Sequence, residues 1–502
     1  MPLANRLFAS IRAHPDAVAV VQGNERYSYA ELGRMIATIA RYLRESGLTT
    51  GDRAALLMTN SFAYTATFYG IWCAGGITVA LNTQAKAREI LNWLNHAQAR
   101  WLFADANHPE LPELRQTATS EIEIIPVPQG RGDAPATHDL WHSDIRRGID
   151  PPAITLQASD PASIIYTSGT TGEPKGVTLS HGNLEANVDS ILEYLHLGPA
   201  DSIVNVLPFY YSYGNSILHT HLSVGAKLIL ENSLLYPHRV LERLVDESAT
   251  GFSGVPSTFN LLLGRLKLED FDLSSLRYLT QAGGPMPPVV ADRLLRALPW
   301  IELYIMYGQT EATARLSYLP PADLNRKRGS IGIAIPGVTL EVRDKSGAPV
   351  KTGETGEICA KGPNIMQGYW QDPEKTAQVI KDGWLHTGDL AHIDDEGYLF
   401  IDGRSSEMIK SGGNRISPKE IEEIIQELDG VGEVAVIGVP DELLGEVIKA
   451  FVVPKGAGAL DKKTVQHHCK SRLALYKIPK FIDFIEALPK TASGKIQRFL
   501  LH

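Results

Sequence analysis

The sequence predicts an α/β fold in which a large N-terminal domain of α/β subdomains, with a small β-rich subdomain, precedes a small mobile α+β C-terminal domain. Three observations support this. The chain has 502 residues, 44% of them hydrophobic, so it can bury more than one core. Strand-like apolar runs alternate with amphipathic helical patterns before about residue 330. After that point helical patterns become rare, and Gly/Pro turns separate short β-like runs.

The α/β alternation is clearest in four places. Apolar residues recur at helical spacing between 30 and 43, and Gly47 then precedes the buried-strand run AALLM. The same order of helix and strand is expected for three more pairs of segments, AYTATFYGIWCAGG with ITVAL, VLERLVDE with TGFSGV, and VVADRLLRAL with IELYIMYG. Such repetition is typical of parallel sheets covered by helices.

The last third of the chain follows two other patterns. The β-rich subdomain is predicted from the short runs VTLEVRD, GEICAKG and GYLFIDG. From Ser417 a helix begins at Pro418, and the strand-like runs EVAVIGV and IKAFVVP follow it. We therefore place the N-terminal domain at 1–403 and the C-terminal domain at 404–502, a size usual for a domain.

Charge and cysteine content restrict the partners. The net charge of -9 disfavours a surface that coats nucleic acid or anionic membranes, because both need a basic face. Three scattered cysteines form neither a disulfide framework nor a metal-ligand pattern, which favours a reducing cytoplasm. With no signal-peptide core and no apolar run of spanning length, we expect a soluble enzyme or binding protein for small molecules.

One tight connection, YTSGTTGEPKG at 166–176, combines the residue types that bind polyphosphate. Glycines let backbone N–H groups converge, hydroxyls add donors, and Lys175 adds a compact positive charge. Gly176 follows Lys175 where a P-loop has Ser or Thr, so that fold is not implied. Taken alone, the segment is equally well explained as a flexible Gly/Thr turn.

Four more segments follow in order: YGQTEA, WLHTGDLAHIDDEGYLFIDGR, EMIKSGGNRISPKEIE and LPKTASGKIQR. Together with the first, they resemble the adenylate-forming superfamily, which comprises acyl- and aryl-CoA synthetases, adenylation domains of nonribosomal peptide synthetases and firefly luciferase. The resemblance covers essentially the whole chain and is strongest to a stand-alone acyl-CoA synthetase or acyl-AMP ligase. It implies that a carboxylate attacks the α-phosphate of ATP and that a thiol then displaces AMP.

The resemblance assigns the phosphate contacts of the first segment to Thr167, Ser168, Gly169, Thr170, Thr171, Gly172 and Lys175. In the second segment, Tyr307 would lie against adenine, Thr310 beside Gln309 would reach a phosphate oxygen, and Glu311 with Thr170 would hold Mg²⁺. Carboxylate and phosphate oxygens are the ligands that this hard cation prefers. In an unrelated protein, Glu311 would be an ordinary acid at a helix N-terminus.

Three further positions complete the predicted nucleotide site. Gly283 and Gly284, in AGGPMP, would pack beside adenine and the acid. Asp389 would accept hydrogen bonds from both ribose hydroxyls, which a carboxylate can do at once. Arg404 would add donors to ribose or phosphate. Without the other segments, turn chemistry would explain the aspartate and a surface position the arginine.

Lys495, in a Ser/Gly loop near the C-terminus, is the predicted catalytic lysine. The resemblance places it on the acyl and α-phosphate oxygens, where it would act mainly in the transition state. The thiol would enter past Gly412 and Gly413, with Arg415 near the acceptor's phosphate. Because both loops belong to one small domain, that domain must rotate between the half-reactions, about a hinge at Ser406. Family members usually carry Asp or Lys at that position.

The acid pocket is less well defined by sequence. LPFYYSYGN resembles the segment that lines it, so Tyr211, with Gly283 and Gly308, is a candidate pocket residue. No carboxylate stands near Tyr210, where amino-acid-activating relatives carry aspartate, so α-amino acids are disfavoured. Aromatic, alicyclic and medium acyl groups stay open, as does ordinary core packing of the tyrosines.

The predicted function is therefore an ATP- and Mg²⁺-dependent acid–thiol ligase that makes acyl-AMP, releases pyrophosphate and transfers the acyl group to coenzyme A. A close alternative is loading of the phosphopantetheine arm of a separate acyl or peptidyl carrier protein. The sequence has no carrier segment after the Lys495 loop, which fits a stand-alone enzyme, and a homodimer stays open. A nonenzymatic nucleotide-binding protein on the same fold is the remote alternative.

Overall fold

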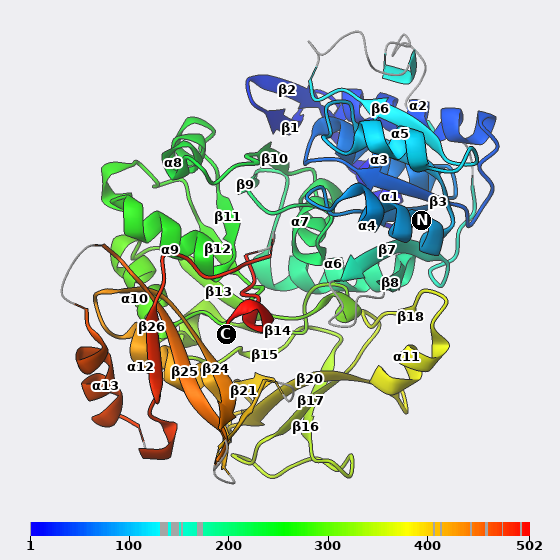
Figure 1. The fold of residues 1–502 in the computed structure, drawn as a ribbon. Coiled ribbons are helices and arrows are strands. Elements are labelled where there is room, and N and C mark those ends of the chain that lie inside the picture. Colours follow the sequence, from blue (N-terminus) through cyan, green and yellow to red (C-terminus); the bar gives the residue numbers. More distant parts are fainter. Residues whose placement is uncertain are drawn as a thin grey trace.

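The computed structural model of the protein describes residues 2–130, 139–141, 150–151, 154–167, 174–404, 407–411, 414–441, 444–456, 460–473, 475–491 and 494–502. Strands within these residues form four sheets (Figure 1). Two large sheets build most of the N-terminal domain, a third forms the β-rich subdomain, and the fourth lies in the C-terminal domain. The predicted α/β fold with its smaller subdomains is confirmed.

The nine-stranded sheet has a parallel centre, β10, β9, β11, β12 and β13, as the predicted helix–strand alternation requires. Its strands, in spatial order, are β15 Ile333–Ala334, β14 Ser317–Leu319, β13 Glu302–Tyr307, β12 Tyr278–Gln281, β11 Gly251–Gly254, β9 Ser202–Asn205, β10 Lys227–Leu230, β1 Val18–Gln22 and β2 Glu25–Ser28. The edge strands β2, β14 and β15 pair antiparallel. The carboxyl end of β13 delivers the YGQTEA segment.

The seven-stranded sheet carries the phosphate-binding candidate on an antiparallel hairpin. Its order is β18 Gly368–Tyr369, β8 Lys175–Ser180, β7 Pro161–Thr167, β4 Ile77–Ala80, β3 Arg53–Leu57, β5 Ala99–Asp105 and β6 Glu123–Val127. The apolar run ASIIY, at 162–166, lies in β7. The helix after β8 begins at His181, because the Ser180 side chain accepts from the Asn183 N–H in a capping box.

Helices cover both sheets of the N-terminal domain. They are α1 Pro2–Ala13, α2 Tyr29–Glu45, α3 Phe62–Cys73, α4 Ala87–Ala97, α5 Leu111–Thr117, α6 His181–Leu195, α7 Ser212–Ser223, α8 Pro237–Asp246, α9 Pro256–Arg265 and α10 Pro288–Ala297. The helical pattern at 30–43 is confirmed as α2. Ser28 and Glu31 form a capping box that fixes the start of this helix. In the described residues no helix is long and apolar enough to cross a membrane.

The β-rich subdomain and the C-terminal domain each have their own core. The subdomain sheet contains β16 Thr339–Arg343, β17 Gly356–Lys361, β19 Ile380–Lys381, β20 Trp384–Ile393 and β21 Leu399–Arg404, with α11 Pro373–Val379 nearby. The C-terminal sheet contains β22 Ile409–Ser411, β23 Asn414–Ile416, β24 Val431–Asp441, β25 Gly445–Pro454 and β26 Phe481–Phe484, with α12 Pro418–Gln426 and α13 Lys462–Lys470. The domain boundary at residue 404 stays a prediction.

The small domain packs against the side of the large domain that carries α9 and α10 (Figure 1). One contact explains the close approach. Gly494 has φ +79°, and a Cβ there would lie 2.8 Å from the Ser257 Oγ of α9. Glycine therefore lets the loop of Lys495 reach the large domain without a clash.

Candidate active site

The β7–β8 hairpin positions the two ends of the phosphate-binding candidate. Thr167 and Lys175 are paired residues of the two strands, so they face each other across the base of the hairpin loop. The other predicted phosphate contacts, Ser168, Gly169, Thr170, Thr171 and Gly172, lie outside the described residues. The structure therefore fixes where this loop starts and ends.

A cavity of about 210 Å³ lies between the two domains. The large domain and the end of β21 contribute Gly283, Gly284, Tyr307, Gly308, Asp389 and Arg404 to its wall, and the C-terminal domain contributes Lys495. These residues are up to 212 positions apart in the sequence and were all predicted as site residues. The fold brings them to one place.

Asp389 is the centre of the polar wall. Its Oδ2 accepts a hydrogen bond of 2.7 Å from the Tyr307 hydroxyl, and its Oδ1 accepts one of 2.8 Å from the Arg404 Nε. Asp389 and Arg404 are partners in the β20–β21 pairing, which fixes this contact. A carboxylate has about four acceptor positions, so two remain for the paired hydroxyls of a ribose. The residues present fit the nucleotide that the motifs imply.

Burial changes the acid–base properties around Asp389. Burial, reinforced by the Asp389 charge, raises the pKa of Tyr307 well above its ordinary value, so this phenol stays a neutral donor. Burial also opposes the charge of Arg404, but the Asp389 carboxylate outweighs it and the pKa of Arg404 rises. Both donors are therefore fixed in their protonated forms.

Lys495 faces the same cavity from the opposite domain. Its backbone N–H donates to Thr491 Oγ1 at 3.1 Å, which closes the loop on itself. Burial is the main cause that lowers the pKa of Lys495, followed by the positive charge of Arg404, while Glu407 and Asp389 oppose the shift. An ammonium in a cavity wall interacts more strongly than one in bulk water with negative charge that develops on a neighbouring oxygen.

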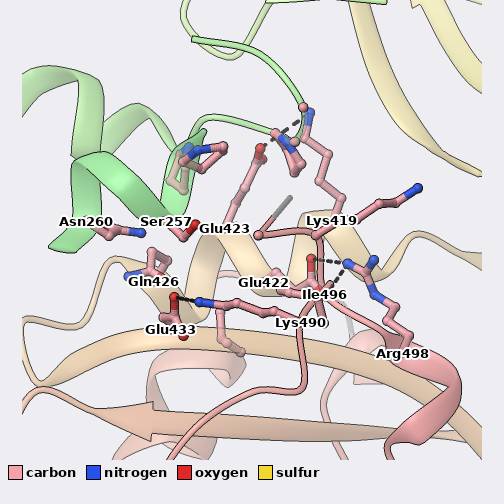
Figure 2. Close-up of a pocket in the computed structure, with 18 residues that line it drawn as sticks. Ser257, Asn260, Lys419, Glu422, Glu423, Gln426, Glu433, Lys490, Ile496 and Arg498 are labelled. Atoms are coloured by element: carbon pink, nitrogen blue, oxygen red, sulfur yellow. Dashed lines mark hydrogen bonds and ion pairs between the residues drawn. The ribbon is translucent and has the colours of Figure 1, made fainter. Parts of the chain in front are cut away.

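The loop of Lys495 is anchored by a partly buried ion pair that sequence reasoning missed. Arg498, three residues further on, donates to both oxygens of Glu422 at 2.9 and 3.0 Å (Figure 2). It also donates to Glu407 at 3.2 Å. Glu422 lies on α12, so the pair ties the loop to the core of the small domain. The sequence showed both residues, inside PKEIE and GKIQR, but not their contact across 76 positions.

The metal candidate Glu311 lies in a short 3₁₀ helix, Thr310–Ala312, directly after β13. Its Oε1 accepts from the Tyr369 hydroxyl at 2.9 Å, and its Oε2 has no hydrogen-bond partner among the residues that the structure describes. Mg²⁺ binds through one or two carboxylates together with substrate phosphates, so the donor set fits this ion. Thr310 Oγ1 lies 3.4 Å from Ser212 Oγ, and Gln309 occupies the N-cap position.

The acid-pocket candidates gather where α7 begins. Tyr211 is the N-cap residue of α7, and its ring centroid lies 4.6 Å from that of Tyr210. Gly308 must be glycine, because a Cβ there would lie 2.1 Å from the Ala314 carbonyl oxygen. Gly283 has φ +84°, which favours glycine, and the Gly284 carbonyl accepts from Gln281 Nε2 at 2.8 Å.

The thiol-acceptor and hinge candidates are mostly outside the described residues. This holds for Ser406, Gly412 and Gly413, and of Arg415 the structure describes only the backbone, in β23. Their assignments stay predictions.

A second residue that sequence reasoning missed is Glu357 on β17. Its Oε1 accepts from the Gly388 N–H at 2.9 Å, and its Oε2 lies 2.9 Å from His386 Nδ1. Gly388 has φ +74° and directly precedes Asp389, so Glu357 holds the turn that presents the central carboxylate. The run GEICAKG predicted a strand, and no feature of that run pointed to the partner 31 residues away.

Replacing Glu357 by Ala is expected to raise the KM for ATP about tenfold, because the Gly388 N–H loses its acceptor and Asp389 loses its fixed position. Steady-state kinetics with ATP varied would measure this. Glu341→Ala is the matched control, since Glu341 pairs with Arg343 on β16 of the same sheet. Equal ATP kinetics for Glu357→Ala and the control would contradict this role.

Comparison with known proteins agrees with this geometry. Residues 7–370 match the family model described as AMP-binding enzyme, and residues 420–495 match AMP-binding enzyme C-terminal domain. The chain belongs to the AMP-binding enzyme family. As a member of it, the protein is an ATP-dependent acid–thiol ligase of the acyl-CoA ligase type, which works through an acyl-adenylate and uses ATP, Mg²⁺ and coenzyme A. The nonenzymatic alternative is set aside.

Two curated relatives of this AMP-binding enzyme match it along nearly its whole length. It is 36% identical to a feruloyl-CoA synthase of Amycolatopsis sp, over 97% of this chain and 95% of the relative. It is 34% identical to an indoleacetate–CoA ligase of Aromatoleum aromaticum, over 96% of this chain and 94% of the relative. Both alignments span the two domains, so the similarity covers the cavity from each side.

Two solved structures share its fold. The anthranilate CoA ligase AuaEII in complex with anthranoyl-AMP superposes with a TM-score of 0.91 at 27% identity, covering 99% of this chain and 96% of that one. ATP-bound MatB from Rhodopseudomonas palustris superposes with a TM-score of 0.89 at 30% identity, covering 99% of this chain and 97% of that one.

Proposed function

We propose that this AMP-binding enzyme assembles its adenylation site between the domains, with Asp389 on the ribose, Glu311 on the metal and Lys495 on the reacting oxygens. The observation that supports this most is the placement of Lys495 and Asp389 on facing walls of one cavity. Mg²⁺, when bound, would neutralise phosphate charge. Thr167, Lys175 and the loop between them would hold the departing pyrophosphate.

Lys495 performs the electrostatic part of the first half-reaction. The acid's carboxylate forms a bond to the α-phosphorus while the bond to pyrophosphate breaks, and negative charge grows on the α-phosphate oxygens. The Lys495 ammonium, which lines the cavity, stabilises that charge more than it stabilises the separated substrates. Tyr307 and Arg404 keep Asp389 fixed meanwhile, so the nucleotide does not shift.

We further propose that the acid has a bulky, flat body. Tyr210 and Tyr211 offer adjacent rings at the start of α7, and two relatives are named for feruloyl and indoleacetyl substrates. ATP–pyrophosphate exchange against fatty, aryl, alicyclic and amino acids tests this. Exchange that is fastest with fatty or amino acids would contradict it.

The finer partner assignments belong to the same proposal. A holo-carrier protein offers the same phosphopantetheine thiol as coenzyme A, so thioester formation with each, measured side by side, separates the two acceptors. Three buried free cysteines, Cys73, Cys359 and Cys469, favour a cytoplasmic location. A homodimer would be detected by sedimentation.

The second half-reaction is proposed to need rotation of the small domain about Ser406. A proline there fixes φ and should slow thioesterification at least several-fold more than adenylation. Single-turnover assays of each half-reaction would measure both rates. The matched control is Ser406→Ala, which keeps the backbone free. Identical rates for Ser406→Pro and Ser406→Ala in both half-reactions would refute the hinge.

A further inference from the structure

Arg315 is a buried cation. It is 3% exposed, and among the described residues no carboxylate lies within ion-pair distance of it. Buried charges are normally paired, because an isolated one loses several kcal/mol of hydration. Lys327, at 7% exposure, follows that rule and contacts both Asp394 and Glu396. Arg315 departs from it, close to the adenylation site.

The groups around the Arg315 guanidinium are neutral. Its Nε donates to the Met306 sulfur at 3.2 Å, and its central carbon lies 4.1 Å from the centroid of the Tyr213 ring. The Tyr194 hydroxyl is also near, and burial raises its pKa, so it stays uncharged. These contacts orient the planar cation, but a guanidinium has five N–H donors and a full charge that they do not neutralise.

A strained turn brings Arg315 into this position. Thr313, a buried β-branched residue, has φ +67° and ψ -48°. The carbonyl of Arg315 accepts from Asn364 Nδ2 at 2.9 Å and from Asn187 Nδ2 at 3.3 Å, while Thr313 Oγ1 donates to the Asn364 carbonyl at 2.6 Å. Such backbone strain persists only when the surroundings impose it, and it is common at functional sites.

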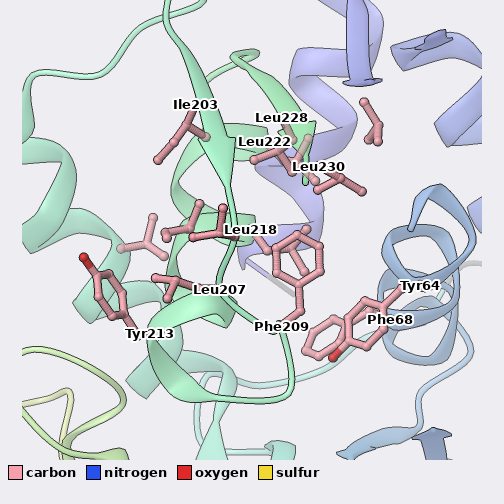
Figure 3. Close-up of a cluster of buried hydrophobic side chains, with 14 of the residues drawn as sticks. Tyr64, Phe68, Ile203, Leu207, Phe209, Tyr213, Leu218, Leu222, Leu228 and Leu230 are labelled. Atoms are coloured by element: carbon pink, nitrogen blue, oxygen red, sulfur yellow. The ribbon is translucent and has the colours of Figure 1, made fainter. Parts of the chain in front are cut away.

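Strand alternation places Arg315 on the opposite side of β13 from the nucleotide. Tyr307 points to Asp389, so its neighbour Met306 points the other way, and Met306 contacts Arg315. Tyr213 lies just inside α7, at the edge of the buried apolar cluster and apart from Phe209 and Tyr64 (Figure 3). The start of α7 is where the acid pocket is expected, so Arg315 lies on the acid side.

The cavity and Arg315 share neighbours. Met306, which contacts Arg315, and Gly308 line the cavity wall, and the Gly308 Cα approaches Ala314 so closely that no side chain fits between them. Ala314 immediately precedes Arg315. An acid whose reacting carboxylate meets Lys495 would therefore extend past Gly308 in the direction of this cation.

We propose that Arg315 binds an anionic substituent at the far end of the acid, a second carboxylate in the simplest case. This rests on the acid site proposed above and adds a substrate class to it. One carboxylate is activated, and the other supplies the negative charge that Arg315 lacks among the described residues. The same cation would repel an ammonium group at that far end of the acid.

The test compares matched acids that differ by one carboxylate: hexanoate with adipate, cinnamate with 4-carboxycinnamate, and phenylacetate with 4-carboxyphenylacetate. ATP–pyrophosphate exchange gives kcat/KM for each. We expect the wild-type protein to favour the second member at least tenfold in one or more pairs. Arg315→Met should abolish that preference and Arg315→Lys should keep part of it. Arg328→Met, which removes an arginine paired with Asp292 on the surface, should leave kcat/KM unchanged for both acids of each pair.

Two results would overturn the proposal. One is a wild-type preference for the monocarboxylate in every pair, which decides the question even if Arg315→Met does not fold. The other is a folded Arg315→Met that keeps a preference for the dicarboxylate. Absence of exchange with all six acids would contradict the proposed acid site itself. The melting temperature of the protein, measured with AMP and each acid, would then test Arg315 separately. Stabilisation by the monocarboxylates but not by the dicarboxylates would refute its role.

Discussion

Replacing Lys495 by Ala is expected to lower the rate of acyl-adenylate formation by about a hundredfold or more, the scale of losing one oxyanion donor. Transfer of the acyl group from preformed acyl-AMP to coenzyme A should be largely spared, because the lysine faces the reacting oxygens only during adenylation. Single-turnover assays that start from ATP and acid, or from synthetic acyl-AMP, would measure the two rates independently.

The control is Lys490→Ala. Lys490 lies five residues from Lys495, forms an ion pair with Glu433 (Figure 2) and does not line the nucleotide cavity. It should retain most of the adenylation rate. If both half-reactions fell equally in Lys495→Ala, the assigned role would be wrong.

The pH dependence of adenylation provides a further check on Lys495. Burial lowers its pKa, so the charged form is lost at a lower pH than for an exposed lysine. Adenylation should therefore decline as the pH rises toward the ordinary lysine pKa, and Lys495→Arg should move that decline to higher pH, since guanidinium stays charged. A profile unchanged by Lys495→Arg would assign the decline to another group.

Replacing Asp389 by Ala is expected to weaken binding of ATP and AMP at least about a hundredfold. Two charge-assisted hydrogen bonds to ribose hydroxyls are lost, and such bonds contribute roughly 1.5–3 kcal/mol each. Titration calorimetry with AMP would measure the loss directly. Asp389→Asn should lose less, because the amide oxygen still accepts one hydrogen bond.

The matched control for Asp389 is Asp402→Ala. Asp402 lies on the neighbouring strand β21 and binds His392 and Thr355, outside the cavity wall. AMP affinity should be unchanged in this variant. A loss of affinity as large as that of Asp389→Ala would show that the effect comes from the subdomain as a whole.

Much of the fold could be predicted from local sequence. The helix α2 could be predicted because its apolar residues recur at helical spacing, a pattern that acts within a few residues. The candidate site residues were found because their motifs are short and ordered along the chain, and Asp389, Arg404 and Lys495 indeed meet at one cavity. Long-range contacts such as Glu422–Arg498 could not be predicted, since their partners follow no local spacing.

What the sequence determined by itself was the class of chemistry, because five ordered motifs resemble those of the adenylate-forming superfamily, and that resemblance implies a nucleotide, a metal and a catalytic lysine. What only the tertiary structure decided was the environment of each group. Burial lowers the pKa of Lys495, Glu357 fixes the turn before Asp389, and a strained Thr313 brings Arg315 inward, where no described residue supplies a counter-charge. These properties depend on which side chains exclude water from one another, and that is set by packing across distant segments.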